Sequence, residues 1–384
     1  MSDPTRPAAA SNPDSRIPIA EPSLGELERR YVREALESSW ISSRGGFLAR
    51  FEQSLAQRLG LDHALATTNG TAALHLALAG LGIGPGDDVV VPDLTFAATA
   101  NAVFMAGARP VLADCAADHF NADAASIARA LTPATKAVIV VHLLGQACRM
   151  EPILDLARDR GLVIVEDCAE ALTATCGGRQ AGSFGAVGCF SFFANKVATT
   201  GEGGAVATAD PDLAQRLERL RAHGMDPERH YWHDRVGYNY RMTNLSAALG
   251  LAQLERLDDL LARRRALAQR YAANLAGLTW LLPPFAAPGR SIDWLHPIWV
   301  DENALGCNRE QVLTALQAAG IDARPMFHPL HLMPPYEELP RGGDLDQATR
   351  LGLTGLLLPL YPDMGPDRVD RVCERLAAIG RSRG

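Results

Sequence analysis

The segment from Cys189 to Gly204, which reads CFSFFANKVATTGEGG, holds the residue best suited to covalent chemistry, Lys196. Lysine occurs at only two positions, 136 and 196, among the 37 basic residues, so arginine carries nearly all of the positive charge. Unlike arginine, lysine can lose a proton near neutral pH and attack a carbonyl as a primary amine. Lys136 precedes an apolar run and is typical of a polar strand entry, whereas Lys196 lies between an aromatic run and a Gly-rich turn. We predict that Lys196 is a nucleophile; the alternative is a surface lysine.

A carboxylate that could assist this lysine ends the apolar run LVIVED, where Glu166 and Asp167 follow a predicted strand. Open α/β sheets bind ligands at the carboxyl ends of their strands. A lysine that forms a Schiff base needs an electron sink, and in pyridoxal phosphate (PLP) enzymes a carboxylate keeps the ring nitrogen of that sink protonated. Asp167 is the predicted partner of that nitrogen, although an acid at this position could equally cap the next helix.

Three further segments suggest how a flat, phosphorylated cofactor would be held. In TTNGTAAL, Gly70 and Thr71 stand at a strand-to-helix turn, where backbone N–H groups and the positive helix end favour an anion. Ser191 could add a hydroxyl, and Phe96 could stack on a ring. Asn239, in GYNYRM, suits phosphate contact. Helix capping by Gly70 and Thr71, and core packing by Phe96, are the alternatives.

The elements that must position these residues alternate regularly along the chain. Short apolar runs separated by helical segments of ten or so residues predict βαβ crossovers and a mostly parallel sheet. We predict a disordered arm over residues 1–22, a large domain over 23–250, and a long connecting helix with a small α/β domain over 251–384. Ser23 and Glu26 are predicted to form a capping box for the first helix. The connecting helix is predicted from Leu245 to about Leu275.

Composition excludes several classes of protein. The net charge is −7 and no basic stripe is present, which argues against a nucleic-acid partner. No apolar run approaches the ~20 residues that span a bilayer, and no signal peptide is evident, so we expect a cytoplasmic protein with no membrane association. The seven cysteines are scattered without a CxxC pair. We therefore expect reduced, buried thiols and predict no metal site.

Several segments, in order, carry a resemblance to a known family: GTAALHLALAGLGIGPGDDVVVP, VHLLGQ, EDCAEAL, FSFFANKVATTGEGG and GYNYRMTN. They resemble the DegT/DnrJ/EryC1/StrS sugar-nucleotide aminotransferases, which are fold-type I PLP enzymes. The resemblance implies that Lys196 forms the Schiff base with PLP and that Asp167 faces its ring nitrogen. It also implies that Gly70, Thr71 and Ser191 hold the phosphate, that Phe96 stacks on the ring, and that the partner subunit of a homodimer contributes Asn239.

One position departs from most of that family. Glu170 stands where the family usually has glutamine, at the residue that meets the cofactor's 3-hydroxyl, and glutamate there is similar to the GDP-perosamine synthases. This subgroup implies GDP-4-keto-6-deoxymannose as acceptor and L-glutamate as amino donor. It also implies a sugar-nucleotide pocket whose residues are His328, His331, Tyr336, Trp40, Ser42 and Arg44. Both histidines could instead be hydrogen-bonded loop residues.

Other readings stay open. The acceptor could be a UDP- or dTDP-linked keto sugar or a 3-keto isomer, because the sequence does not fix how the hexose lies over the cofactor. Related sugar dehydratases replace the lysine with histidine, so Lys196 argues against that branch. A non-catalytic regulator on the same scaffold would have no need to keep Lys196, Asp167 and the phosphate turn together.

Overall fold

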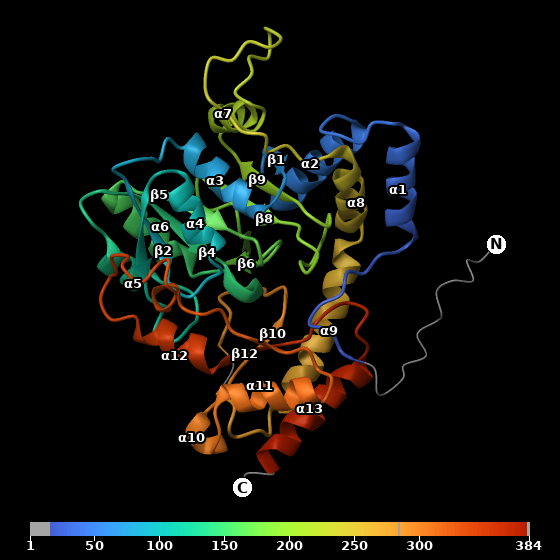
Figure 1. The fold of residues 1–384 in the computed structure, drawn as a ribbon, viewed down its shortest axis with the longest axis vertical. Helices are drawn as coiled ribbons and strands as arrows, with labels where there is room; N and C mark the ends of the chain where they lie inside the picture. Colours follow the sequence, from blue (N-terminus) through green and yellow to red (C-terminus); the bar gives the residue numbers. More distant parts are fainter. Residues whose placement is uncertain (1–15, 283–284, 382–384) are drawn as a thin grey trace, which may run out of the picture.

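The computed structural model describes residues 16–282 and 285–381, and its centre is a seven-stranded sheet (Figure 1). In spatial order the strands are β1 (His63–Thr67), β9 (Gly204–Thr208), β8 (Val187–Ser191), β5 (Val163–Asp167), β4 (Thr135–Val141), β2 (Asp88–Pro92) and β3 (Arg109–Ala113). Only β9 runs against its neighbours β1 and β8, while the pairs among β8, β5, β4, β2 and β3 are parallel. The prediction of a mostly parallel sheet is confirmed.

Helices cover both faces of this sheet, as the apolar strand sequences require. Side chains alternate along β2, so Val89 and Val91 pack on one face and Val90 on the other. The first face carries α3 (Gly70–Gly80), α4 (Ala98–Met105) and α7 (Pro211–Arg221). The second face carries α5 (Ala124–Ala130) and α6 (Met150–Arg160), with α2 (Gly46–Leu59) and α8 (Asn244–Glu255) over its β1–β9 side.

The predicted connecting helix is two helices. It is broken at Arg256 (φ −97°, ψ 0°) into α8 and α9 (Leu257–Leu275). The Arg256 guanidinium donates to Glu28 Oε1 over 2.6 Å at this point. Neither Gly nor Pro marks the break in the sequence, so the helical pattern alone could not reveal it.

The capping box of the first helix, α1 (Glu26–Glu37), lies two residues later than predicted. Gly25 is the N-cap, and its N–H donates to Glu28 Oε2 over 2.7 Å. Glu28 is buried against Gln253 and Arg256, and these contacts favour it over Glu26 as the partner of the cap. The prediction of Ser23 and Glu26 was wrong because a distant helix selects the carboxylate.

A smaller antiparallel sheet follows α9, with strand order β10 (His296–Trp299), β12 (Gly355–Leu358) and β11 (Arg324–Pro325). Around it lie α10 (Glu302–Leu305), α11 (Arg309–Ala318), α12 (Asp346–Thr354) and α13 (Pro366–Arg381). The remaining short elements are η1 (Leu143–Gly145), η2 (Leu330–Leu332) and the two-stranded pair β6 (Thr175–Cys176) and β7 (Arg179–Gln180). Figure 1 shows α9 joining the large sheet to this smaller part of the molecule.

The end of the predicted disordered arm belongs to this smaller part. Ile17 is fully buried, forms a bridge with Ile321, and donates its N–H to Gly320 O over 2.8 Å. The expectation of disorder is therefore wrong for residues 16–22, because an apolar side chain there completes a core. Residues 1–15 of the predicted arm lie outside the described residues.

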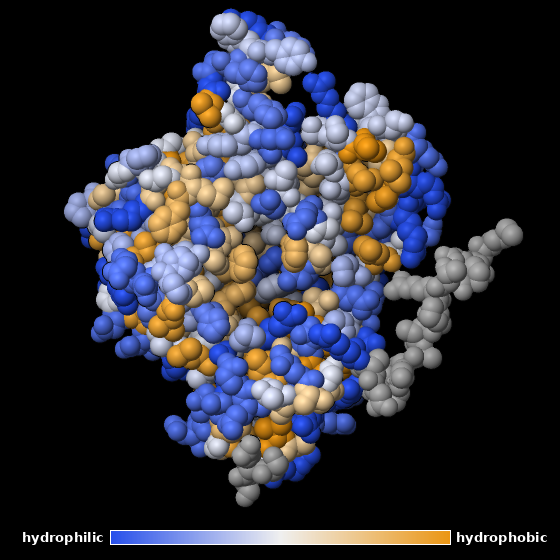
Figure 2. All heavy atoms as spheres, viewed as in Figure 1, coloured by the Kyte–Doolittle hydropathy of each residue, from blue (hydrophilic) through white to orange (hydrophobic). Residues whose placement is uncertain are grey.

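All seven cysteines are free thiols, and all but Cys176 are buried, as expected. None of the described helices is both long and apolar enough to cross a membrane. On the face shown in Figure 2, hydrophobic side chains gather over α8, whereas polar side chains predominate over α1 beside it.

Candidate active site

The predicted cofactor residues meet at one edge of the large sheet. β2, β4, β5 and β8 are parallel, so their carboxyl ends share this edge. A cavity of about 310 Å³ opens there, within the range of small-molecule sites. Seven predicted residues line it: Gly70, Thr71, Phe96, Asp167, Glu170, Ser191 and Lys196.

Lys196 reaches the cavity from a closed loop after β8. The Lys196 N–H donates to Phe193 O, and the Thr200 N–H donates to Phe192 O, each over 2.9 Å. The Lys196 side chain is 14% exposed, whereas Lys136 is exposed at the start of β4. The loop therefore presents one mostly buried primary amine to the cavity.

Asp167 ends β5 as a buried carboxylate. Its Oδ2 accepts from the Thr99 hydroxyl over 2.9 Å, and its Oδ1 accepts from the Ala169 N–H over 3.1 Å. Burial raises the pKa of Asp167 above its usual value. No described lysine, arginine or histidine forms an ion pair with it. A cationic group of a ligand in the cavity could therefore form an ion pair with this carboxylate.

Glu170 lies between the lysine and the turn after β4. Its Oε1 is 3.6 Å from Lys196 Nζ, and its Oε2 accepts from the Leu144 N–H over 2.9 Å. Burial raises the pKa of Glu170, and the Lys196 charge opposes that rise. A protonated Glu170 could donate a hydrogen bond, and an ionised one could accept it from a ligand hydroxyl.

The other end of the cavity is the N-terminus of α3. Asn69 caps this helix by accepting from the Ala72 N–H over 2.8 Å, which leaves the N–H groups of Gly70 and Thr71 outside the helical hydrogen bonding. A Cβ on Gly70 would lie 3.0 Å from Ser191 Cβ, and one on Gly204 would lie 2.3 Å from Asn69 O. The two glycines let the backbone of the turn close on the strand behind it.

These features fit PLP. The N-terminus of α3 and Ser191 suit a phosphate, the Lys196 amine suits an aldehyde, and the buried Asp167 carboxylate suits a protonated ring nitrogen. The Phe96 side chain is 60% exposed beside these groups and offers a ring face.

The other predicted residues do not line this cavity. Asn239 is exposed and pairs with Ala222 through the backbone. Trp40, Ser42 and Arg44 are exposed in the turn before α2, where Asn244 binds the carbonyls of Trp40 and Ser42.

The three residues of the C-terminal part that were predicted to bind the sugar nucleotide differ in burial and in hydrogen bonding. His328 is exposed, although its neighbour Phe327 lines the cavity. The ring Nδ1 of His331 is 2.7 Å from Asp93 Oδ2, and the backbone N–H of His331 donates to Asp93 Oδ1. Tyr336 is buried and donates to Asn101 Oδ1 over 2.7 Å. In a single chain, His331 and Tyr336 already have protein partners.

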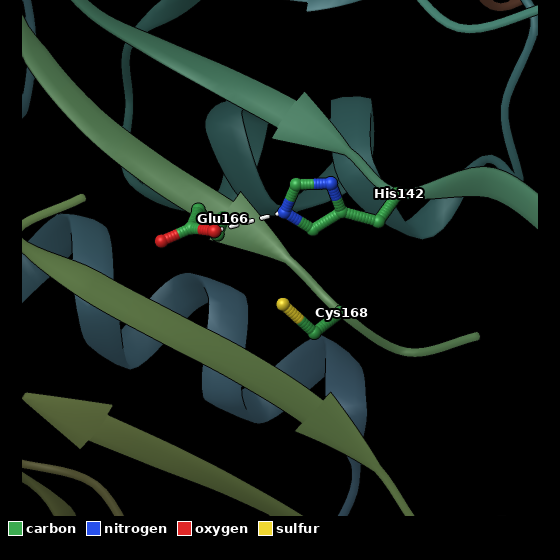
Figure 3. Close-up of side chains that lie close together, drawn as sticks. All are labelled: His142, Glu166 and Cys168. Carbon is green, nitrogen blue, oxygen red and sulfur yellow. Dashed lines mark hydrogen bonds and ion pairs between the residues drawn. The ribbon is translucent and has the colours of Figure 1, made fainter. Parts of the chain in front are cut away.

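Behind Asp167 lies a buried cluster of His142, Glu166 and Cys168 (Figure 3). His142 Nε2 is 2.9 Å from Glu166 Oε2, and its Nδ1 accepts from the Cys148 N–H over 2.9 Å. Burial raises the pKa of the Cys168 thiol to about 12, so it holds its proton. Both ring nitrogens are engaged, which leaves no imidazole lone pair for a metal.

Glu166 also anchors the loop before β8. Its carboxylate accepts from the N–H groups of Gly182, Phe184 and Gly185 over 2.6–2.8 Å. Because side chains alternate along β5, Glu166 holds this loop on one face while Asp167 serves the cavity on the other.

Two residues that contact the charged groups of the site were not predicted. Thr99, on α4, donates to the Asp167 carboxylate, and Trp294, before β10, lines the cavity with its ring centroid 4.2 Å from Lys196 Nζ. Thr99 stands three residues after Phe96 in the segment already singled out, so it could have been found. Trp294 has no such signal, because only the folded chain brings it to the lysine.

Comparison with known proteins agrees with this geometry. Residues 22–377 match the model of the DegT/DnrJ/EryC1/StrS aminotransferase family. The GDP-perosamine synthase of Caulobacter vibrioides is 48% identical, over 95% of this chain and 98% of its own. That of Escherichia coli O157:H7 is 41% identical, over 94% and 97%. Spr1654 of Streptococcus pneumoniae, a candidate sugar aminotransferase solved in its PLP form, has a TM-score of 0.90 at 29% identity and covers 96% of this chain and 100% of its own.

Proposed function

Since the chain belongs to the DegT/DnrJ/EryC1/StrS aminotransferase family, we propose that it transfers the amino group of L-glutamate to GDP-4-keto-6-deoxymannose, giving GDP-perosamine. It is a PLP-dependent sugar aminotransferase. The observation that carries the proposal is the cavity that brings the Lys196 amine, the buried Asp167 carboxylate and the α3 N-terminus together. The names of the similar GDP-perosamine synthases support the choice of acceptor.

We infer a role for each of the seven predicted residues that line the cavity. Lys196 bonds to the cofactor aldehyde, and Asp167 binds the ring nitrogen as an ion pair. Gly70, Thr71 and Ser191 bind the phosphate, while Phe96 covers one face of the ring. Glu170, beside Lys196, binds the ring hydroxyl.

When bound, PLP supplies an aldehyde that takes up an amine and a ring that accepts the electron pair released at the adjacent carbon. Asp167 strengthens this effect because its negative charge holds the proton on the ring nitrogen. Thr99 and the Ala169 N–H fix both carboxylate oxygens in place. With the donor amino acid in its place on the cofactor, the Lys196 amine would be free to take up the proton from the α-carbon of L-glutamate and to hold it in the cavity. In the second half of the reaction, Lys196 returns a proton to the sugar carbon that gains nitrogen.

We infer that the active enzyme is a homodimer and that Asn239 acts on the partner's cavity. Asn239 lies at the base of a segment, residues 223–240, that projects beyond α7 (Figure 1), and it pairs there with Ala222 at the end of α7. In this segment Tyr231, Trp232 and Val236 are 80%, 54% and 86% exposed. Exposed apolar side chains of this size favour burial against another protein surface.

Mixing two inactive variants tests the shared site. Lys196→Ala and Asn239→Asp should each be inactive alone. In a hybrid dimer, one site would carry both substitutions and the other neither, so mixing with subunit exchange should restore activity. Failure to restore activity despite exchange would place Asn239 in its own subunit's site.

Two further expectations stay predictions. One is the cytoplasmic location, and the other is that the sugar nucleotide is bound by Trp40, Ser42, Arg44, His328, His331 and Tyr336.

A panel of substrates tests the reaction. L-Glutamate is supplied with GDP-, UDP- and dTDP-linked 4-keto-6-deoxy sugars, and both 2-oxoglutarate and the amino sugar are measured. We expect turnover with GDP-4-keto-6-deoxymannose, with nitrogen at C4. Turnover confined to UDP or dTDP sugars, or nitrogen at C3, would contradict the proposed acceptor while leaving the aminotransferase assignment intact.

A further inference from the structure

Trp294 makes two contacts with the loop that carries Lys196. Its indole N–H donates to Asn195 O over 2.9 Å, across 99 residues of sequence. Its ring centroid lies 4.2 Å from Lys196 Nζ, well inside the range of a cation–π contact. The side chain is buried and lines the cavity. The ring therefore touches the amine and is itself fixed to the residue next to it.

The backbone carbonyl of Trp294 has an anchor of its own. Its carbonyl accepts from Arg264 Nη1 over 2.8 Å, and the same nitrogen donates to Leu360 O over 2.9 Å. Arg264 lies on α9, and its burial lowers its pKa to about 10. A buried guanidinium is costly unless its donors are used. The Arg264 side chain therefore connects the Trp294 carbonyl to α9 and to Leu360, which follows β12 of the small sheet.

Residues 292–294 also support Glu170, the second group beside Lys196. The Ile292 N–H donates to Gly145 O over 3.1 Å. Leu144, which precedes Gly145, donates its N–H to Glu170. Leu144 has a positive φ of 54°, which is unusual for a branched residue. Residues 292–294 thus support both groups that face Lys196 Nζ, the ring directly and the carboxylate through the 144–145 turn.

We propose that Trp294 is a positioning residue for the reaction: its ring face holds the Lys196 amine beside Glu170, and its anchors tie that amine to α9. The inference rests on the proposed function for its catalytic meaning. The contact itself belongs to the protein alone, so it can be measured without cofactor.

The two lysines of the chain make the measurement selective. The cofactor-free protein is treated with a small amine-acylating reagent, and peptide mass spectrometry gives the labelling rate at Lys196 relative to the exposed Lys136. Because the ring holds and shields the ammonium, Trp294→Leu should raise this ratio by roughly two- to fivefold. Trp294→Phe keeps a ring face but loses the bond to Asn195, so a smaller rise is expected. An unchanged ratio in a folded Trp294→Leu protein overturns the proposal.

A second set of measurements is needed in case Trp294→Leu fails to fold. It also distinguishes failure of this inference from failure of the proposed function. If Trp294→Leu does not melt cooperatively, the test uses Trp294→Phe instead. An unchanged labelling ratio of Lys196 to Lys136 in that variant would contradict the proposal. In PLP-loaded protein, the pH midpoint of the visible absorbance should move in the variants. A wild-type protein that takes up no PLP at Lys196 would overturn the proposed function, yet the labelling ratio would still test the contact.

Discussion

Lys196 Nζ lies 3.6 Å from Glu170 Oε1 in a cavity that is also lined by the buried carboxylate of Asp167. One lysine therefore faces two acids whose pKa values are both raised by burial. Perturbed ionisable groups that converge on a cavity are typical of catalytic sites. The arrangement costs stability in the absence of a ligand, and this cost is measurable.

Replacing Glu170 with glutamine should stabilise the cofactor-free protein at pH 7. The raised pKa of Glu170 means that the folded state binds its proton more tightly than the unfolded state does. Stability from this group therefore rises as the pH falls through the raised pKa toward the usual value of about 4.3, and the penalty is largest at pH values above the raised pKa. Glu170→Gln should raise Tm at pH 7 by roughly 1–3 °C and flatten the pH dependence of Tm.

The exposed Glu374 provides the control, because Glu374→Gln should leave both quantities unchanged. A lower Tm for Glu170→Gln at pH 7 would mean that its attraction to Lys196 outweighs its burial.

Replacing Asp167 with asparagine should impair the chemical step. An amide has nearly the same shape but no charge with which to hold a proton on the ring nitrogen. We expect kcat to fall by about 10²–10³-fold at saturating PLP, by analogy with the loss of other preorganised electrostatic groups. Steady-state kinetics measures this, with circular dichroism to check folding. Activity within threefold of wild type would show that the carboxylate is not needed.

Adding a methyl group at Gly204 should disturb the phosphate end of the cavity. The new Cβ would lie 2.3 Å from Asn69 O, a backbone atom that cannot move without the turn before α3. Gly204→Ala should cost about 1–3 kcal/mol of unfolding free energy and weaken PLP binding at least tenfold. Gly46→Ala is the matched control, since a Cβ there meets nothing within 4 Å. Equal PLP affinity in the two variants would refute this account of the turn.

His331 and His328 should behave differently, although both were predicted to contact the sugar nucleotide. His331 pairs with the buried Asp93, whereas His328 is exposed. His331→Ala leaves a buried carboxylate without its partner and should cost about 3–5 kcal/mol in denaturant unfolding. His328→Ala should leave stability unchanged. A stable His331→Ala protein with a raised KM for the sugar would instead favour the direct binding role.

The residues that could be predicted from the sequence each end or follow a strand of one parallel sheet. Gly70 and Phe96 follow β1 and β2, and Asp167 and Ser191 are the last residues of β5 and β8, so local sequence fixes their edge of the sheet. The scarcity of lysine then singled out Lys196. Alternation of apolar runs and helices was enough to predict the sheet that brings them together.

What could not be predicted depends on contacts between distant segments. Trp294 meets Asn195 across 99 residues, and His331 meets Asp93 across 238. No periodicity encodes such pairs, because packing rather than propensity selects them. For the same reason the burial of Ile17 against Ile321 was missed. The division into a large domain over 23–250 and a C-terminal part over 251–384 stays a proposal.

The most direct test of the central claim is to locate the bond to the cofactor. The protein is loaded with PLP, reduced with sodium borohydride, digested, and analysed by peptide mass spectrometry, with Lys136 as the internal control. The account predicts a pyridoxyl phosphate adduct on Lys196, none on Lys136, and loss of both adduct and visible absorbance in Lys196→Ala. An adduct on Lys136, or visible absorbance unaffected by Lys196→Ala, would contradict it.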